Sequence, residues 1–399
     1  MDKKNKNPNV PNLRFSRVPY ITYKMKDFTK RITRKNKDNF CNLALTISAQ
    51  YGLVDQISFF NKTIASKDMS GYYLLKNGEF AYNKSYSKDY PWGTIKRLDL
   101  YDQGCLSTLY ICFKCNEKYI DSSYLVHYFE SPKWHKQVAN IAGEGARNHG
   151  LLNIAIDDFF MTKHKIPSLE EQRKIAKFFN LIDERIQTQI KIINDYEILK
   201  NKINERIYSE LEDNYIKFKD TYLRAKEGGT PSTSIPKYYN GTIPFIKIDD
   251  LTNKYISTNK SFISDSGLKN SSAWIIPTNS IILSNGATIG CVSINKYPVS
   301  TKQGILGIIP KKEILTEYLY YLINTVQFKR KLKTITTKGT IDCAYIKDID
   351  TLKVKIPNMN LQIKIVKILS CFDIKIQIEK NLLNNLKLLK TYLLNNLFI

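Results

Sequence analysis

One segment of this chain occurs twice, and the two copies align without a gap. "IPSLEEQRKIAKFFNLIDERI" begins at Ile166, and "IPNMNLQIKIVKILSCFDIKI" begins at Ile356, 190 residues later. In each copy Ile-Pro ends the preceding segment, and Ser168 or Asn358 follows as a favourable N-cap. Each copy therefore predicts a long helix, and the repeat divides the chain into two mixed segments, each followed by a helix.

The apolar positions of both copies follow a heptad pattern. From Ile175 and Ile365 onward, they recur at alternating steps of four and three residues, which is the spacing of a coiled-coil seam. The fifth and eighth seam positions are polar in both copies: Gln189, Lys200, Glu379 and Lys390. Shared polar positions favour pairing of the two helices, because polar seam residues fix the register. The alternative is that each helix merely packs on its own domain.

Charge favours an antiparallel pair. Antiparallel pairing sets Lys200 against Glu379 and Lys390 against Gln189, whereas parallel pairing in register sets the two lysines against each other. The apolar pairs of the antiparallel register include Ile203 with Ile376 and Ile207 with Phe372. Two similar helices paired in this way imply a pseudo-two-fold arrangement.

We therefore expect an α+β fold in which two mixed α/β domains are joined by two long helices that form an antiparallel coiled coil. The expected boundaries are a first domain at 1–165, a central helix at 166–212, a second domain at 213–355 and a C-terminal helix at 356–399. Strand-like stretches lie at 106–114 and 274–283, and helical candidates lie at 122–141 and 316–332.

Composition restricts the partners and the compartment. Lys plus Arg number 61 against 37 Asp plus Glu, a net charge of +24, which suggests a nucleic acid or an anionic membrane surface as partner. No apolar run approaches 18 residues, and "MDKKNKNPNV" has no apolar signal core, so we expect no membrane segment. Seven cysteines, an odd number, fit a reducing cytoplasm better than a disulfide framework.

Several phrases resemble the specificity subunit of type I restriction–modification systems. The helical repeat is similar to the family's conserved regions, although Leu361 replaces the usual Glu in the second copy. "GGTPSTSIPKYYNGTIPFIKIDDL", "SNGATIG" and "PVSTKQGILGIIP" look like one common type of target-recognition domain. "AQYGLVDQISFFNKTIAS" and "EGARNHGLLNIAIDDFF" look like a different type. "NVPNLRF" near the N-terminus also looks like the family's usual opening.

The resemblance implies a non-catalytic, DNA-reading subunit for DNA methylation and bacterial defence. Each mixed segment would read one half of a bipartite, asymmetric site in double-stranded DNA. The helices would form the spacer on which two modification subunits and two restriction subunits assemble. S-adenosylmethionine, ATP and Mg²⁺ would belong to those partners, and this chain would hold no cofactor.

The sequence agrees that catalytic motifs are absent. It has no Gly-x-x-x-x-Gly-Lys-Ser/Thr loop, no Gly-x-Gly-x-x-Gly loop and no Asp/Asn-Pro-Pro-aromatic motif. Cys112 and Cys115 have a zinc-like spacing, but a strand would place them on opposite faces, so we expect no metal site. The acid-x-Lys spacing of Asp373 and Lys375 occurs in nucleases, but it falls within the second helix, where we expect solvated surface.

Loop residues whose side chains suit base edges or phosphates are the candidates for DNA contact. In the first domain these are Gln50, Tyr51, Lys84, Ser85, Arg147, Asn148 and His149. In the second domain they are Thr230, Ser232, Thr233, Lys237, Asn285, Lys302, Gln303, Lys338 and Thr340. Any one of them has the alternative of being a solvated loop residue. Two other functions stay open: a stand-alone DNA-binding regulator with two reading heads, and an enzyme whose site has no familiar motif.

Overall fold

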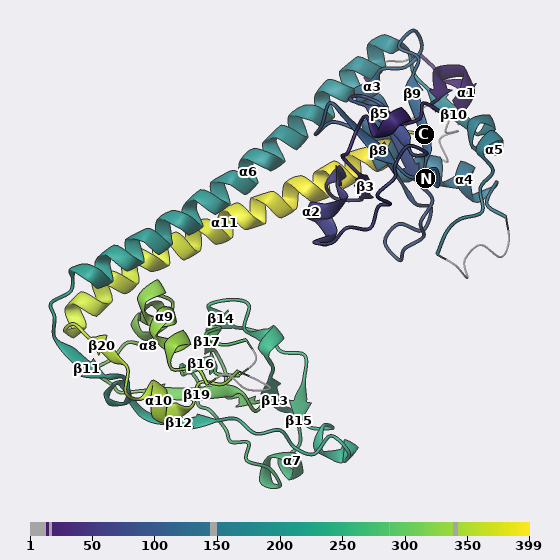
Figure 1. Cartoon of the computed structure of the whole chain (residues 1–399). Helices are drawn as coiled ribbons and strands as arrows, with labels where there is room; N and C mark the ends of the chain where they lie inside the picture. Colours follow the sequence, from purple (N-terminus) through teal and green to yellow (C-terminus); the bar gives the residue numbers. More distant parts are fainter. Residues whose placement is uncertain (1–12, 16–17, 144–149, 287, 338–341) are drawn as a thin grey trace, which may run out of the picture. The chain divides into compact units, whose positions relative to one another are not determined.

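The computed structural model describes residues 13–15, 18–143, 150–286, 288–337 and 342–399. The chain forms two compact units (Figure 1). The first comprises residues 1–189 and 382–399, and the second comprises residues 190–381. Each unit takes part of both long helices.

The two repeat copies form long helices. They are α6 (Leu169–Glu210) and α11 (Met359–Leu397). The side chains of Ser168 and Asn358 accept hydrogen bonds from the backbone N–H groups of Glu171, at 3.4 Å, and Leu361, at 3.0 Å. Both therefore act as the expected N-caps.

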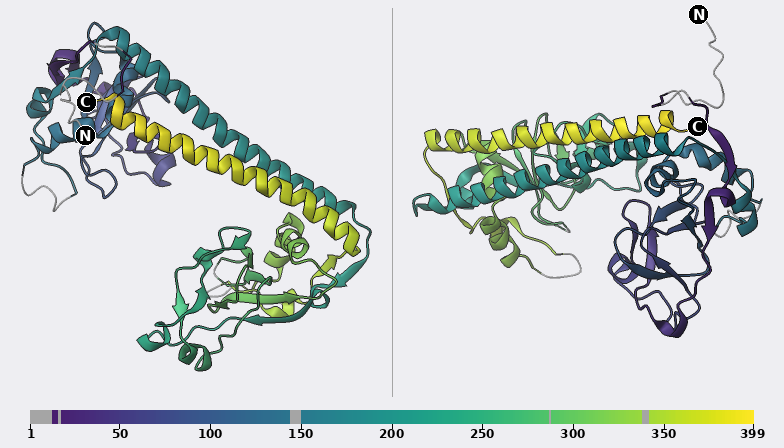
Figure 2. Two further views of the ribbon diagram at one scale, coloured as in Figure 1. Left: turned by 180° about the vertical axis from the view of Figure 1, so that it is seen from behind. Right: turned by 90° about the horizontal axis from the view of Figure 1, so that it is seen from above.

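Within each unit, the segments of α6 and α11 lie side by side and antiparallel (Figures 1 and 2). In the second unit Lys200 contacts Asp373, whereas Glu197, earlier in α6, contacts Lys380, later in α11. The predicted seam is also observed, since Ile186, Ile193, Ile365, Leu369 and Ile376 are buried. The α+β fold with an antiparallel helix pair is confirmed.

The mixed domain of the first unit consists of short antiparallel strands with small helices. A four-stranded sheet has the order β2, β9, β6 and β7. Three two-stranded sheets are formed by β1 and β10, by β3 and β4, and by β5 and β8. The strands are β1 (Ile21–Lys24), β2 (Thr29–Arg31), β3 (Leu45–Ser48), β4 (Gly52–Asp55), β5 (Tyr73–Lys76), β6 (Phe80–Asn83), β7 (Thr94–Arg97), β8 (Gln103–Leu106), β9 (Ile111–Cys115) and β10 (Lys163–Ile166). The helices are α1 (Met25–Phe28), α2 (Gln56–Phe60), α3 (Ser122–Glu130), α4 (His135–Ala139) and α5 (Ile156–Met161).

The mixed domain of the second unit is built around a five-stranded sheet in the order β12, β19, β16, β17 and β14. A three-stranded sheet contains β15, β13 and β18, and β11 pairs with β20. The strands are β11 (Tyr215–Lys217), β12 (Tyr222–Glu227), β13 (Ile243–Ile246), β14 (Tyr255–Ile256), β15 (Phe262–Ile263), β16 (Ile281–Ser284), β17 (Val292–Asn295), β18 (Ser300–Thr301), β19 (Ile305–Pro310) and β20 (Lys353–Lys355). The helices are α7 (Asp265–Lys269), α8 (Thr316–Ile323), α9 (Val326–Thr334) and α10 (Ile346–Ile349).

Both sequence-predicted strands and both helical candidates are interrupted. The stretch at 106–114 ends β8 and begins β9, with a turn between them, and the stretch at 274–283 enters β16 only at Ile281. The candidates at 122–141 and 316–332 break near Ser131 and Thr325, whose side chains accept backbone N–H groups at the start of the following helical turn. Polar capping residues thus ended helices that apolar periodicity alone would continue.

Each unit has a core that combines its sheet with both long helices. In the first unit Phe80, Phe113, Ile175 and Phe179 belong to one apolar cluster with Leu397. In the second unit Leu283, Leu306 and Leu319 belong to one cluster with Tyr208 and Leu369. The helices are therefore part of each domain's core, so the domains are fixed on them by apolar packing.

Candidate nucleic-acid interface and domain junctions

Three loops of the domain in the second unit meet at one edge. The Thr230 hydroxyl accepts a hydrogen bond from the backbone N–H of Gln303 at 3.3 Å. The backbone N–H groups of Asn285 and Gly286 both donate to the carbonyl of Gly304, at 3.0 and 3.2 Å. The loops at 228–234, 285–286 and 302–304 therefore form one surface that carries several of the predicted contacts.

Glycines allow this close approach. A Cβ on Gly228 would lie 2.2 Å from the carbonyl oxygen of Thr301, and a Cβ on Gly229 would lie 2.3 Å from the backbone nitrogen of Ala273. Gly304 has a φ of +84°, a conformation that other residues rarely adopt. The two glycines of the "GGTPSTS" stretch thus allow tight backbone packing.

The predicted contact residues differ in accessibility. Ser232, Thr233, Lys237, Lys302 and Gln303 are exposed, so their side chains are open to a ligand. The prediction that Asn285 contacts DNA is wrong. Its side chain is 1% exposed and donates a hydrogen bond to the carbonyl of Ala344 at 3.1 Å. Its amide holds two loops together, so base contact is not available to it here. Lys338 and Thr340 lie outside the described residues.

The first domain presents its candidates on two loops. Gln50 and Tyr51 are exposed at the turn between β3 and β4. Ser85 is exposed and pairs with Leu151, whereas Lys84 is half-buried and donates to the carbonyl of Ile154 at 3.4 Å. Arg147, Asn148 and His149 lie outside the described residues.

A glutamine of each repeat copy holds the start of a domain helix. The side-chain oxygen of Gln172 accepts the backbone N–H of Asp121 at 2.7 Å, next to α3. The side-chain oxygen of Gln362, 190 positions later, accepts the backbone N–H of Leu315 at 2.9 Å, next to α8. Both glutamines are 1% exposed, so each repeat copy anchors its own domain at an equivalent place.

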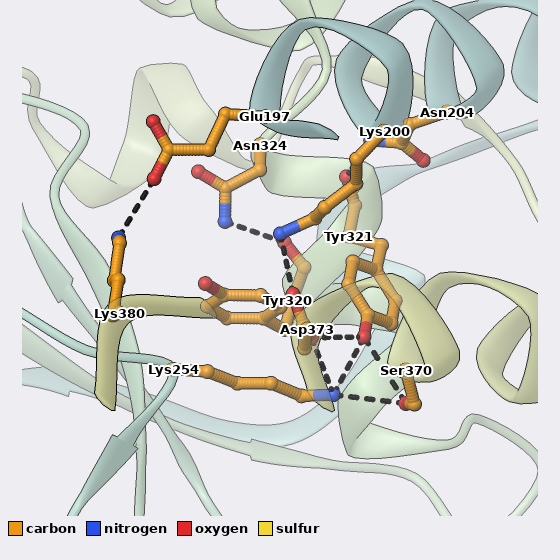
Figure 3. A network of polar contacts seen from close by, with 10 residues as sticks. All are labelled: Glu197, Lys200, Asn204, Lys254, Tyr320, Tyr321, Asn324, Ser370, Asp373 and Lys380. Atoms are coloured by element: carbon orange, nitrogen blue, oxygen red, sulfur yellow. Dashed lines mark hydrogen bonds and ion pairs between the residues drawn. The ribbon is translucent and has the colours of Figure 1, made fainter. Parts of the chain in front are cut away.

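A polar cluster joins the second domain to both helices, and Figure 3 shows its members converging on Asp373. We call Lys200, Lys254, Tyr321, Ser370 and Asp373 the second junction. The Asp373 carboxylate accepts from Lys200 of α6 at 2.6 Å, from the Tyr321 hydroxyl of α8 at 2.5 Å and from Lys254 at 3.3 Å. Lys254 also donates to Tyr321 at 2.7 Å and to Ser370 at 3.1 Å. The expectation that Asp373 lies on solvated surface is therefore wrong, because its carboxylate binds side chains from α6 and from the domain.

An equivalent cluster occurs in the first unit. We call His127, Glu130, Asn180, Asp183 and Lys390 the first junction. Lys390 of α11 contacts Asp183 of α6 at 2.6 Å and Glu130 of α3 at 2.8 Å. His127 Nε2 lies 2.9 Å from the Asn180 side-chain oxygen, and its Nδ1 faces Glu130 and Asp183 at 3.6 and 3.9 Å. One ammonium group thus joins the domain to both helices.

The local charges fit these contacts. Burial acts to raise the pKa of Glu130, but hydrogen bonding from His127 and the charges of Lys390 and Lys96 lower it to about 2. Burial opposes the charge on Lys390, yet the carboxylates of Glu130 and Asp183 raise the pKa of that ammonium. Burial lowers the pKa of Lys254 in spite of Asp373. In the first junction the charged forms of Glu130 and Lys390 are therefore both favoured by their partners. In the second junction, burial of the Lys254 ammonium outweighs the attraction of Asp373.

The two junctions are related by the repeat. Asp183 and Asp373 occupy equivalent positions, as do Lys200 and Lys390, and so do Asn180 and Ser370. In each unit the lysine of one helix therefore pairs with the aspartate of the other. Sequence reasoning identified the lysines as polar seam positions but missed the aspartates. The signal that would have found them is the Asp kept at the same place in both copies.

The predicted register needs correction. Lys200 pairs with Asp373 and not with Glu379, which contacts Lys375 of its own helix at 2.6 Å. Lys390 pairs with Asp183, six positions before Gln189. The apolar packing agrees: the cluster that holds Ile203 and Ile207 contains Ile365 and Leu369, in place of Ile376 and Phe372. These contacts fit a register one heptad away, which presents the same seam. The physical reason is that each lysine reaches sideways to a carboxylate beside the seam.

One group of potential metal ligands is found among the described residues. The ligand atoms of His127, Glu130 and Asp183 lie within 4.8 Å of one another. The Lys390 ammonium contacts both carboxylates, so a cation of the protein already occupies this position. Among the parts of the chain that the structure describes, no helix has the length and apolarity needed to cross a membrane.

Residues 214–388 match the family described as type I restriction modification DNA specificity domain. The MjaIX specificity subunit of Methanocaldococcus jannaschii is 37% identical over 175 residues, which are 43% of this chain and 40% of that relative. The HindI specificity subunit of Haemophilus influenzae is 37% identical over 114 residues, which are 28% of this chain and 25% of that relative. The chain thus spans less than half the length of these two relatives.

Solved structures share the fold over nearly the whole chain. A chain from a study of complex assembly and conformational transition of the type I R-M system aligns with a TM-score of 0.63 at 15% identity, covering 94% of this chain and 96% of the other. The S subunit of a type I restriction–modification system from M. genitalium aligns with a TM-score of 0.52 at 15% identity, covering 98% and 99%. At this identity the likeness concerns the fold.

Proposed function

We propose that this chain, whose residues 214–388 match the type I restriction modification DNA specificity domain, reads the DNA site for a multisubunit methyltransferase and nuclease. Each recognition domain reads one half of a bipartite, asymmetric site in double-stranded DNA, and the chain itself performs no chemistry. Two modification subunits, which bind S-adenosylmethionine, and two restriction subunits, which use ATP and Mg²⁺, supply the reactions. The complex works in the cytoplasm.

The observation that carries this proposal is the repeated attachment of two different domains. Gln172 and Gln362 anchor α3 and α8 at equivalent helix positions, yet the sheets of the two domains have different strand orders. Two different domains that are attached at equivalent helix positions suit a DNA site with two different halves. The net charge of +24 supports a polyanionic ligand, because neutralisation of phosphates supplies much of the affinity for DNA.

The direct experiment is domain exchange in the complex with the modification partner. Residues of about 16–165 are replaced with the equivalent domain of a relative, and methylated sites are mapped by sequencing. One half of the recognised site should change while the other stays the same, because each domain has its own core. A change in both halves would show that the domains do not read separately.

The purified chain alone should neither methylate nor cleave DNA. The reason is the absence from the sequence of the cofactor and nucleotide loops that these reactions use. Turnover by a verified, contaminant-free preparation would contradict the non-catalytic role. Full site-specific binding by the chain without its partners would instead favour a stand-alone regulator.

The helices should set the gap between the half-sites. Helix α6 has 42 residues, which corresponds to roughly 63 Å and to about 18 base pairs as an upper limit. Removal of one heptad from each helix at matching positions should shorten the gap and leave both half-site sequences unchanged. An unchanged gap would show that the helices do not determine spacing.

A further inference from the structure

The second junction connects three chain elements through one carboxylate. Asp373 belongs to α11, Lys200 to α6, and Lys254 to the recognition domain, just before β14. Tyr321 adds a second domain contact, since its hydroxyl donates to the same carboxylate at 2.5 Å. Any rotation of the domain against the helix pair would therefore separate Lys254 and Tyr321 from Asp373 together.

The first junction makes the same three-way connection with different domain chemistry. Its centre is the Lys390 ammonium of α11, which contacts Asp183 of α6 and Glu130 of the domain. The lysine and aspartate of the helices are repeat-equivalent to those of the second junction. In the first unit the domain supplies the Glu130 carboxylate, which pairs with Lys390 of α11. In the second unit the domain supplies the Lys254 ammonium, which pairs with Asp373 of α11.

Apolar packing alone does not account for the second junction. A cleft of about 820 Å³ opens beside it, lined by polar residues such as Asn201, Asn253 and Gln377 as well as by Lys254 and Asp373. Beside this cleft, Lys254 and Tyr321 connect the domain to Asp373 through polar contacts, in addition to the apolar core to which Tyr321 also belongs. Buried ion pairs contribute little net stability relative to apolar residues, but they require one geometry. Ion pairs of this kind are therefore suited to fix the orientation of the domain on the helices.

We propose that the two junctions are positioning sites: each holds its recognition domain in one orientation on the helix pair and thereby restricts the gap between half-sites that the complex accepts. The inference rests on the proposed function, because gap selectivity requires that both domains read DNA. It adds that gap length depends on side chains at the domain attachment in addition to helix length.

The key variant is Lys254→Met, which keeps the aliphatic stem and removes the ammonium that reaches Asp373. The matched control is Lys380→Met, because the Lys380 to Glu197 pair at 2.7 Å joins the two helices without a domain residue. Tyr321→Phe is a second variant that removes only a hydroxyl, and it keeps the test available where Lys254→Met fails to fold.

The first measurement is methylation by the complex with the modification partner. Substrates are duplexes with the wild-type gap, or with one base pair more or fewer. Loss of a charge-assisted contact should reduce the preference for the wild-type gap by about tenfold in Lys254→Met, with unchanged half-site sequences. Lys380→Met should keep the full preference. An unchanged preference in Lys254→Met and in Tyr321→Phe would overturn the positioning role.

The second measurement uses the full chain by itself, without partner subunits or DNA, so that it does not depend on the proposed function. Spin labels are attached through noncanonical amino acids at the exposed positions 202 in α6 and 269 in α7. The distribution of distances should broaden in Lys254→Met and stay narrow in Lys380→Met. An equally narrow distribution in Lys254→Met would refute the inference. If the wild-type complex methylates no duplex, the proposed function fails while this distance test still decides the role of the junction.

Discussion

The buried imidazole of His164 should make the stability of the first unit strongly pH-dependent. His164 Nδ1 lies 2.8 Å from the Tyr128 hydroxyl, and Nε2 lies 2.8 Å from the Thr162 hydroxyl. Since that Thr162 hydroxyl donates to the carbonyl of Phe159 at 2.6 Å, it accepts from Nε2–H. Nδ1 then accepts from Tyr128. The neutral ring is fully paired, and burial lowers the pKa of His164 from 6.5 to about 4.

The sign and size of the effect follow from linkage. The folded-state pKa lies below the unfolded value, so this contribution to stability is complete above pH 6.5 and is lost as the pH falls towards 4. Compared with pH 8, the loss should be about 2 kcal/mol at pH 5 and about 3 kcal/mol at pH 4. Glu130, whose pKa is lowered to about 2, adds a loss mainly below pH 4.5, so the two windows are distinct.

Urea unfolding followed by tryptophan fluorescence can measure this loss. The chain has three tryptophans, and Trp274→Phe leaves Trp92 and Trp134, both of which lie in the first unit. The comparison is between His164 and the variant His164→Gln in that background. The free energy of unfolding of the variant should fall less between pH 8 and pH 4, by about 3 kcal/mol. Parallel pH profiles for the two proteins would show that burial does not hold the His164 ring in its neutral form.

Three further changes test local features. Leu369→Ala should destabilise the second unit by about 2–5 kcal/mol, because the Leu369 side chain is 0% exposed. Urea unfolding followed at Trp274 measures this loss, and a value well below about 1 kcal/mol would contradict the place of Leu369 in the core. Asp121→Ala should cost about 1 kcal/mol in thermal unfolding of the first unit, because its carboxylate caps α3 through the N–H of Tyr124. Gly93→Ala should destabilise the first unit by more than about 1 kcal/mol, because φ is +74° and the added Cβ would lie 2.2 Å from the carbonyl oxygen of Asn83; unchanged stability would show that the loop relaxes freely.

The elements that depend on local pattern could be predicted from the sequence. The gapless repeat, its N-caps and its heptad seam predicted two long helices, and seam positions such as Ile193 and Leu369 are buried in the structure. These features depend on residues close together in the chain, where spacing alone specifies the geometry.

The contacts between the helices and the domains could not be predicted from local sequence pattern. A heptad seam presents the same face after every seven residues, so charge matching among Lys200, Glu379 and Lys390 could not distinguish neighbouring registers. The deciding partners were Asp373 on the other helix, with Lys254 and Tyr321 from the recognition domain, and no short-range pattern joins residues so far apart. The burial of Asn285 likewise depends on a loop more than fifty residues away, which the sequence does not place beside it.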